Sequence, residues 1–290
     1  MSLISDFFRI FADIIYSIIN LMDTNKVLYI SQEITPYLPD SPMAVLSQKL
    51  PQGIQEKGNE VRTFMPKYGC IKERRNQLHE VIRLSGLNIV IDDSDHPLII
   101  KVATLQPARM QVYFIDNEDY FLRGQTTKEL ETVLSPEDND ERIMFYVRGV
   151  AETVKKLRWD PNLVHCSGWV SALAPIYLKK IYSEDPAFNN AKIVYSLFDD
   201  KFEGTLNKRM VEKLKLEGFS KSDLSILGKS AVNWKTLNKL AIEYSDGIVQ
   251  ASPEIDPELK EYIEKSGKKF LPYPGDEDYI DKYAEFYAQL

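Results

Sequence analysis

Short apolar runs rich in β-branched residues alternate with longer helical segments along most of the 290-residue chain. The first example is a run at Lys26–Ser31, a helical pattern over residues 43–57 that is closed by Gly58, and a second run at Glu60–Met65. Strands separated by helices of this length are expected to be parallel, because a parallel pair needs a long crossover connection. The alternation predicts an α/β fold with a doubly wound, mostly parallel sheet.

The middle of the chain departs from this alternation before it returns. Short apolar runs at Val81–Leu84, Leu98–Ala103 and Met110–Ile115 are separated by turn-rich segments such as Asp92–Pro97, which predicts a small β-hairpin insert. The later elements are expected at Glu141–Leu157 (helix), Leu163–Cys166 (strand), Trp169–Ile181 (helix), Lys192–Phe198 (strand), Trp234–Tyr244 (helix), Gly247–Gln250 (strand) and Tyr279–Leu290 (a final helix that packs back on the sheet).

The composition excludes several classes of protein. The 36 Lys and Arg against 43 Asp and Glu give a net charge of -7, which lacks the basic excess of a nucleic-acid-binding protein. Two cysteines and three histidines are too few for a disulfide framework or a histidine-rich metal centre, and they fit a reducing cytoplasm. Asp116, Asp119, Asp199 and Asp200 fit turn chemistry as well as metal ligation. We expect no metal and no cofactor.

The first residues form a unit of their own in the sequence. Residues 3–22 have apolar positions at helical spacing, which predicts an amphipathic helix or leader over 1–24, followed by one domain over 25–290. Asp6, Arg9 and Asp13 interrupt the apolar run, so it is a poor transmembrane or secretory segment. An interfacial membrane helix, a helix docked on the body and a leader upstream of a start at Met22 all stay open.

Loops at the carboxyl ends of the parallel strands are where an open α/β sheet binds its ligands. In this chain, the loops are expected at Gln32–Leu46, Cys166–Trp169 and Asp199–Gly204. Function is therefore expected to lie there.

Motifs in these loops and beyond them follow one another in a recognisable order. They lie at residues 29–37 (Tyr-Ile-Ser-Gln-Glu-Ile-Thr-Pro-Tyr), 58–69, 113–121, 140–142, 161–179, 244–246 and 252–253. The ordered set resembles the opening of bacterial glycogen and starch synthases, glycosyltransferase family 5, over about residues 26–255.

This resemblance implies a Rossmann-like domain that forms one half of a two-domain GT-B glycosyltransferase. In the family, the first half holds the glucan acceptor and part of the sugar, and the second half holds most of the nucleotide. The residues after Pro253 are too few to build that second half, so we expect a short form that lacks it. The partners that the resemblance implies are an α-glucan, a nucleotide sugar and a chain that supplies a second domain.

The sequence departs from the family in the loop after the first strand. Where the family has Lys-x-Gly-Gly, this chain has Pro39, Asp40, Ser41 and Pro42. Proline lacks an amide donor, and Asp40 places a negative charge where a diphosphate would lie. The resemblance implies that these residues, with Glu33, form a degenerate sugar and nucleotide loop.

A second group of departures affects the loops that follow later strands. The family's His-x-His-Asp-Trp is His165-Cys-Ser-Gly-Trp169 here, and a family histidine in the later Thr-Ile-His-Asn motif is replaced by Phe198. A phenyl ring makes none of the hydrogen bonds of an imidazole. We assign no catalytic residue. The positions that the resemblance assigns to the acceptor and sugar crevice are His165, Ser167, Gly168, Trp169, Phe198 and Asp199.

Single residues in this set allow structural interpretations as well. Tyr37, Tyr120 and Trp169 could stack on sugar rings, but core packing is the stronger interpretation of each ring. His165 at a strand end is either a satisfied residue that bridges strand and loop or a base. Glu33 either accepts a bond from a sugar hydroxyl or caps the following loop.

Two functions follow as hypotheses. One is a glycogen or starch synthase-like glycosyltransferase domain that is inactive as an isolated chain. The alternative is a non-catalytic glucan-binding or regulatory partner protein with a degenerate active site. The departures leave open whether the chain is an enzyme.

Overall fold

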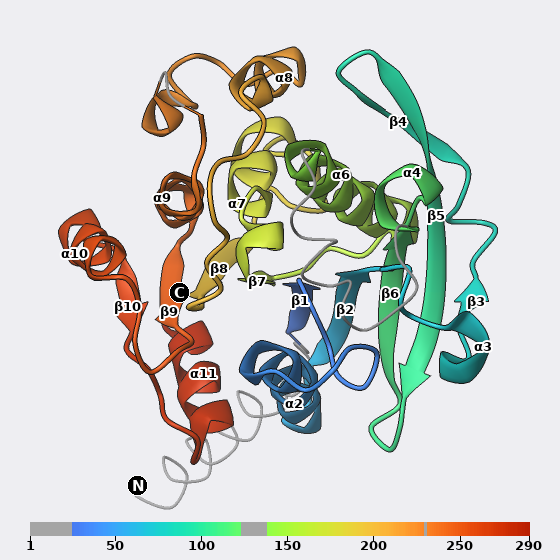
Figure 1. Cartoon of the computed structure of the whole chain (residues 1–290). Coiled ribbons are helices and arrows are strands. Elements are labelled where there is room, and N and C mark those ends of the chain that lie inside the picture. The colour runs from blue at the N-terminus through green and yellow to red at the C-terminus, as the bar shows by residue number, and fades with distance from the viewer. Residues whose placement is uncertain (1–24, 123–137, 229–230) are drawn as a thin grey trace, which may run out of the picture.

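The computed structural model describes residues 25–122, 138–228 and 231–290 (Figure 1). Its centre is a ten-stranded sheet in the order β10-β9-β8-β7-β1-β2-β6-β5-β3, with β4 paired to β5. The predicted α/β class with a mostly parallel sheet is confirmed. The strands are β1 (Lys26–Ser31), β2 (Glu60–Pro66), β3 (His79–Glu80), β4 (Leu87–Ile91), β5 (Ser94–Leu105), β6 (Met110–Asp116), β7 (Leu163–Ser167), β8 (Lys192–Leu197), β9 (Gly247–Gln250) and β10 (Lys269–Leu271).

The strands from β10 to β6 are all parallel to their neighbours, and β5 then adds an antiparallel extension with β3 and β4. The central strands β1 and β7 are buried along almost their whole length, because helices cover both faces of the sheet. Burial on both faces explains why these strands appear in the sequence as continuous apolar runs.

Helices cover the two faces of the sheet unequally (Figure 1). The helices α2 (Pro42–Glu56) and α11 (Tyr279–Ala288) lie on one face, and α6 (Asn139–Leu157), α7 (Ala174–Ile176) and α9 (Trp234–Tyr244) lie on the other. The remaining helices are α3 (Glu73–Asn76), α4 (Glu118–Phe121), α8 (Met210–Leu216), α10 (Pro257–Ser266), the 3₁₀ turns η1 (Trp169–Ser171) and η3 (Ser225–Leu227), and the π-turn η2 (Tyr177–Ile181).

Local chemistry fixes the start of α2, which borders the carboxyl edge of the sheet. The Ser41 hydroxyl caps the helix by accepting a 2.9 Å bond from the Ala44 amide, and Pro42 occupies the first turn, where a missing N–H has no cost. Further along α2, a Cβ added at Gly53 would lie 2.5 Å from Ile280 Cδ1. The glycine therefore permits the close packing of α2 against α11.

The predicted hairpin insert is correct in kind and wrong in detail. Val81–Leu84 is a turn, while the strand β3 precedes it and β4 follows it, which the sequence interpretation missed. Much of the turn-rich Asp92–Pro97 segment belongs to β5, since the turn itself is confined to Asp92 and Asp93. The run at Met110–Ile115 becomes β6, which is parallel to β2 and so belongs to the main sheet.

The predicted helix at Trp169–Ile181 is also wrong as a single element. It consists of η1, the short α7 and the π-turn η2, with Pro175 at the start of α7. The final helix is confirmed as α11, and it is preceded by α10 and β10, which were not predicted. The predicted amphipathic helix over residues 1–24 lies outside the described residues. Within the described ranges, no helix is long and apolar enough to cross a membrane.

Candidate functional site

The loops after β1, β7 and β8 meet at the carboxyl edge of the sheet. Gln32 joins the first two, since its amide donates to the Ser167 carbonyl at 3.1 Å and its side-chain oxygen accepts from the Val170 amide at 3.2 Å. The Tyr68 hydroxyl donates to the Gln32 carbonyl at 3.0 Å. These bonds join the loop after β1 to the loops after β7 and β2.

Gly168 occupies the turn between β7 and η1. Its φ of +81° lies in the left-handed region, and a Cβ there would lie 2.7 Å from Gln32 Oε1 and 2.9 Å from Met43 Sδ. The space next to this glycine is therefore filled by Gln32 and Met43. Ser167, which precedes it, is buried and lies in register with Ser31 of β1 and Ser196 of β8.

Trp169 follows and is 2% exposed, so it packs in the core. Its indole lies 4.8 Å from the ring of Phe202, and its amide donates to Asp200 Oδ2 at 2.9 Å. The second oxygen of Asp200 accepts a 3.1 Å bond from the indole N–H of Trp234 in α9. Asp200 thus ties the loop after β7 to α9.

The Asp200 carboxyl has an unusual pKa for an aspartate. Burial raises its pKa from 3.8 to about 7, and the bonds from Trp169 and Trp234 oppose this shift only in part. Sequence reasoning selected the neighbouring Asp199 instead. Asp199 is exposed, forms a 3.0 Å ion pair with Lys201, and its amide donates to the Ser252 hydroxyl. Sequence alone gave no sign of which of the two aspartates turns inward.

The loop at residues 39–42 lies at the N-terminus of α2. Pro39, Asp40 and Pro42 are exposed, and Asp40 Oδ1 accepts a 2.6 Å bond from the Thr35 hydroxyl. Glu33 is buried, which raises its pKa, and a hydrogen bond from Ser41 offsets part of this shift. The bond with Ser41 ties the Glu33 carboxyl to the loop at residues 39–42.

Phe198 does not face solvent. It packs in a small apolar cluster with Met43 and Ala251, against which Leu46 also packs. This cluster joins the start of α2 to the ends of β8 and β9, and it lies where the later loops meet the loop at residues 39–42.

His165 lies under α11, away from solvent. Its Nε2 bonds to the Ser196 hydroxyl at 2.7 Å and its Nδ1 to the Tyr287 hydroxyl, while Tyr29 and Tyr283 lie beside its ring. Burial lowers its pKa to about 3. In this structure, His165 is buried and bonded at both nitrogens, so it bridges β7, β8 and α11.

The other aromatic and metal candidates are also buried or paired. Tyr37 and Tyr120 are buried, so neither presents a ring to solvent. Asp116 is buried and pairs with Lys101 at 2.7 Å. Among the residues that the structure describes, no three His, Cys, Asp or Glu side chains converge on a metal site. Burial raises the pKa of the Cys166 thiol, which disfavours the reactive thiolate.

The open space at this edge is a cavity of about 400 Å³ between α2 and residues 273–283. Its lining includes residues 40–42 and three tyrosines of the C-terminal segment. The lining residues are Asp40, Ser41, Pro42, Val45, Leu46, Lys49, Ala251, Tyr273, Pro274, Gly275, Asp276, Tyr279 and Tyr283. Sequence reasoning identified the loop and predicted that the final helix from Tyr279 packs back on the sheet, but it did not place residues 273–283 against α2.

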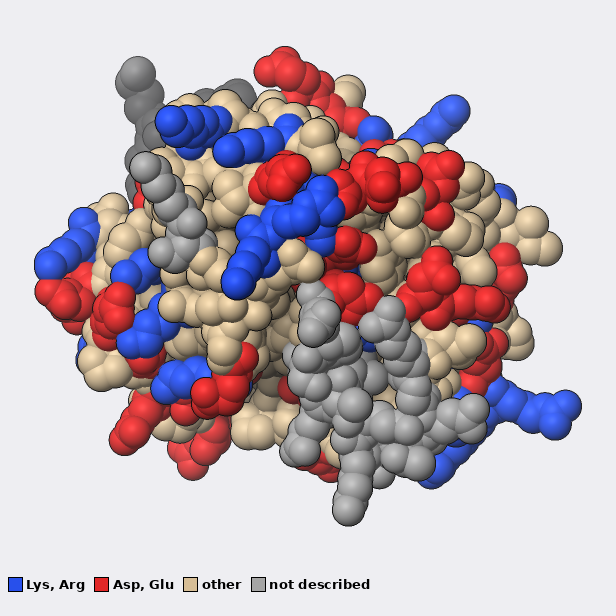
Figure 2. All heavy atoms as spheres, turned by 45° about the horizontal axis from the view of Figure 1, so that its top comes forward, with Lys and Arg blue, Asp and Glu red and all other residues tan. Residues whose placement is uncertain are grey.

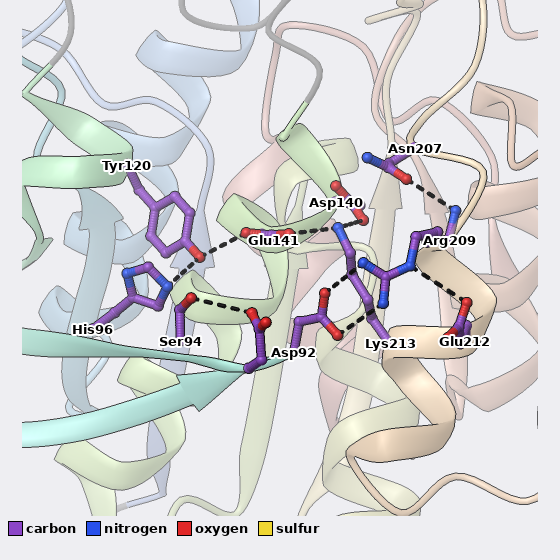
Figure 3. A network of polar contacts seen from close by, with 11 residues as sticks. Asp92, Ser94, His96, Tyr120, Asp140, Glu141, Asn207, Arg209, Glu212 and Lys213 are labelled. Carbon is purple, nitrogen blue, oxygen red and sulfur yellow. Dashed lines mark hydrogen bonds and ion pairs between the residues drawn. The ribbon is translucent and has the colours of Figure 1, made fainter.

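A separate polar network joins β5, α4, α6 and α8 (Figure 3). Lys213 of α8 is 2% exposed, and its ammonium donates to Asp140 at 2.8 Å and to Glu141 at 2.5 Å. The Tyr120 hydroxyl donates to Glu141 at 2.9 Å and bonds to His96 Nε2 at 2.8 Å. Opposite charges pair within this network, which connects the four elements.

Charge on the molecular surface agrees with the composition. In the face drawn in Figure 2, Lys and Arg side chains are interspersed with Asp and Glu, and the described residues form no continuous basic surface in that view. The face therefore lacks the electrostatic footprint of a nucleic-acid-binding surface.

Comparison with solved structures supports the fold. The catalytic domain of Starch Synthase IV from Arabidopsis thaliana, solved bound to ADP and acarbose, superposes with a TM-score of 0.71 over 87% of this chain and 51% of that chain, at 20% identity. At this identity, the likeness concerns the fold, which is the α/β fold of the GT-B starch synthase catalytic domain.

Comparison with known sequences gives the family. The glycogen synthase of Chlorobium limicola is 33% identical over 230 residues, which are 77% of this chain and 47% of the relative. That of Chlorobaculum parvum is 30% identical over 83% of this chain and 48% of the relative. The chain thus spans about half the length of these relatives. Residues 26–269 match the family of the starch synthase catalytic domain, glycosyltransferase family 5. The chain belongs to this family and is a glycogen/starch synthase-like glycosyltransferase domain.

Proposed function

We propose that this protein acts in α-glucan metabolism by binding α-glucan at the carboxyl edge of its sheet, with residues 25–290 as one domain. The observation that carries the proposal is the match to glycogen synthases over most of the chain, at up to 35% identity among the relatives compared. The carboxyl edge is where an open α/β sheet binds ligands, and it carries the 400 Å³ cavity.

We further propose that the chain alone does not transfer glucose from a nucleotide sugar. Transfer requires positive groups or oriented N–H donors that stabilise the leaving diphosphate. The loop at residues 39–42 offers Asp40 and two prolines instead, and Ser41 is engaged as the cap of α2. A partner chain that supplies a second, nucleotide-binding domain is part of this proposal, as is a cytoplasmic location, since Cys70 and Cys166 are not joined by a disulfide.

A non-catalytic glucan-binding or regulatory role is the second candidate. The observation that favours it is the packing of the crevice. Phe198 lies against Met43. The space next to Gly168 is filled by Met43 and Gln32. Glu33, Ser167 and Asp199 would then shape the edge of the sheet without reacting.

Two measurements on the purified full chain test these proposals. Calorimetric titration is expected to detect binding of maltooligosaccharides and none of ADP-glucose or UDP-glucose. Incorporation of labelled glucose into glycogen is expected to stay at the level of a reaction without protein. Turnover in the ordinary enzymatic range of about 1–10³ s⁻¹ by the lone chain would refute the second proposal, and the absence of any glucan binding would refute the first.

A further inference from the structure

The 400 Å³ cavity has one wall made by a single face of α2. Pro42, Val45, Leu46 and Lys49 line it, and their spacing places them on the same side of the helix. The opposite wall is the segment from Tyr273 to Tyr283, which lies against α2 because α11 packs on that helix.

This second wall lies outside the residues that match the family. The match ends at residue 269, whereas three tyrosines and Asp276 of the cavity follow it. One wall of the cavity is therefore formed by residues that the family model does not match.

The chemistry of the lining selects the kind of ligand. The partly exposed rings of Tyr273 and Tyr279 and the apolar side chains of Val45 and Leu46 offer surface for the apolar face of a ring, as ligand cavities of this size commonly do. Asp40 and Asp276 supply hydrogen-bond acceptors. Asp40 Oδ1 accepts a bond from the Thr35 hydroxyl at 2.6 Å, and Asp276 Oδ1 accepts one from the Tyr273 hydroxyl at 2.8 Å. The second oxygen of each carboxylate can accept a bond from a ligand.

The charge of the lining disfavours phosphate. Two carboxylates face one ammonium group, that of Lys49, so the lining carries a net negative charge. A diphosphate would meet repulsion from Asp40 and Asp276, whereas neutral hydroxyl groups can donate to both. A neutral sugar fits this lining, because it carries several hydroxyl groups on a compact ring that has an apolar face.

We propose that this cavity binds a neutral pyranose unit of an α-glucan, between α2 and the tyrosines of the C-terminal segment. The identity of the sugar rests on the proposed function. The position of the site rests on the cavity alone.

Calorimetry with maltotriose on the full chain tests the proposal. Tyr279→Ala removes a partly exposed lining ring and is expected to weaken binding at least 10-fold, while Tyr279→Phe keeps the ring and is expected to bind within about 3-fold of the parent. Tyr262→Ala is the matched control, because Tyr262 is partly exposed on α10 and lies outside the cavity. Melting temperatures report whether each variant is folded.

A second pair of variants does not depend on α11. Asp276→Asn replaces an exposed acceptor of the cavity and is expected to weaken maltotriose binding, whereas Glu277→Gln, next in the chain, is expected to leave it unchanged. Maltotriose binding by the parent that none of the lining variants alters would overturn the site and leave the proposed function standing. Absence of maltotriose binding by the parent would overturn both. Binding of ADP-glucose that Tyr279→Ala abolishes would overturn the charge argument and, with it, the site.

Discussion

At the scale of single residues, Gly168 combines two constraints that can be separated. Its φ of +81° strains any other residue, and an added Cβ would also overlap Gln32 and Met43. Gly204 has a similar φ of +76° and nothing within 4 Å of an added Cβ. We expect Gly204→Ala to lower the free energy of unfolding by about 1–2 kcal/mol from backbone strain, and Gly168→Ala to lower it by about 1–3 kcal/mol more. Urea denaturation measures both, and equal losses would contradict the packing argument.

The sequence predicted some residues of the site and not others for a physical reason. Gly168 and Trp169 were identified because motifs place them next to the end of a strand. The sequence did not show which carboxyl of Asp199 and Asp200 turns inward, because the position of Asp200 depends on the indole of Trp234, which is distant in sequence. Pairs of like residues in a loop cannot be told apart before the partner is known.

At the scale of elements, Lys213 joins α8 to the start of α6 through a buried ion pair. Replacing it with methionine would leave Asp140, which is 0% exposed, without its cation. We expect Lys213→Met to lower the free energy of unfolding by about 3–5 kcal/mol, because removal of one partner leaves a buried charge uncompensated. Lys215→Met on the same helix is the control, since Lys215 is exposed, and its effect is expected within about 0.5 kcal/mol. A loss no larger than the control's would contradict a stabilising role for the pair.

Elements with strong apolar periodicity were predicted well. Elements whose conformation depends on tertiary contacts were not. The bounds of β1 and α9 agree with the sequence pattern because their apolar spacing reflects burial against the sheet. The π-turn at Tyr177–Ile181 has no such signal. The helix α10 did carry end signals, since Asp256 caps it, Pro257 opens it and Gly267 ends it, yet only its Leu259 and Ile263 are buried.

At the scale of the whole molecule, two buried groups act on stability in opposite directions as pH changes. The pKa of Asp200 is about 7 in the folded protein against 3.8 ordinarily, so between these values the folded state holds the extra proton and stability falls as pH rises. The pKa of His165 is about 3 against 6.5, so between these values the unfolded state holds the extra proton and stability rises with pH. The two contributions oppose each other between pH 3.8 and 6.5.

When one of the two groups is removed, the pH dependence of stability is expected to show the contribution of the other. In Asp200→Asn, the free energy of unfolding should rise with pH relative to that of the parent between pH 3.8 and 7, by up to about 1.4 kcal/mol per pH unit. Loss of an acceptor for Trp169 or Trp234 lowers the stability of this variant at every pH. The informative quantity is therefore the slope of the free energy of unfolding against pH. Asp199→Asn, with an exposed carboxyl, should have a profile parallel to that of the parent. Urea denaturation across this pH range measures all three proteins. A parallel profile for Asp200→Asn would mean that the carboxyl which ties the loop after β7 to α9 stays charged in the folded protein.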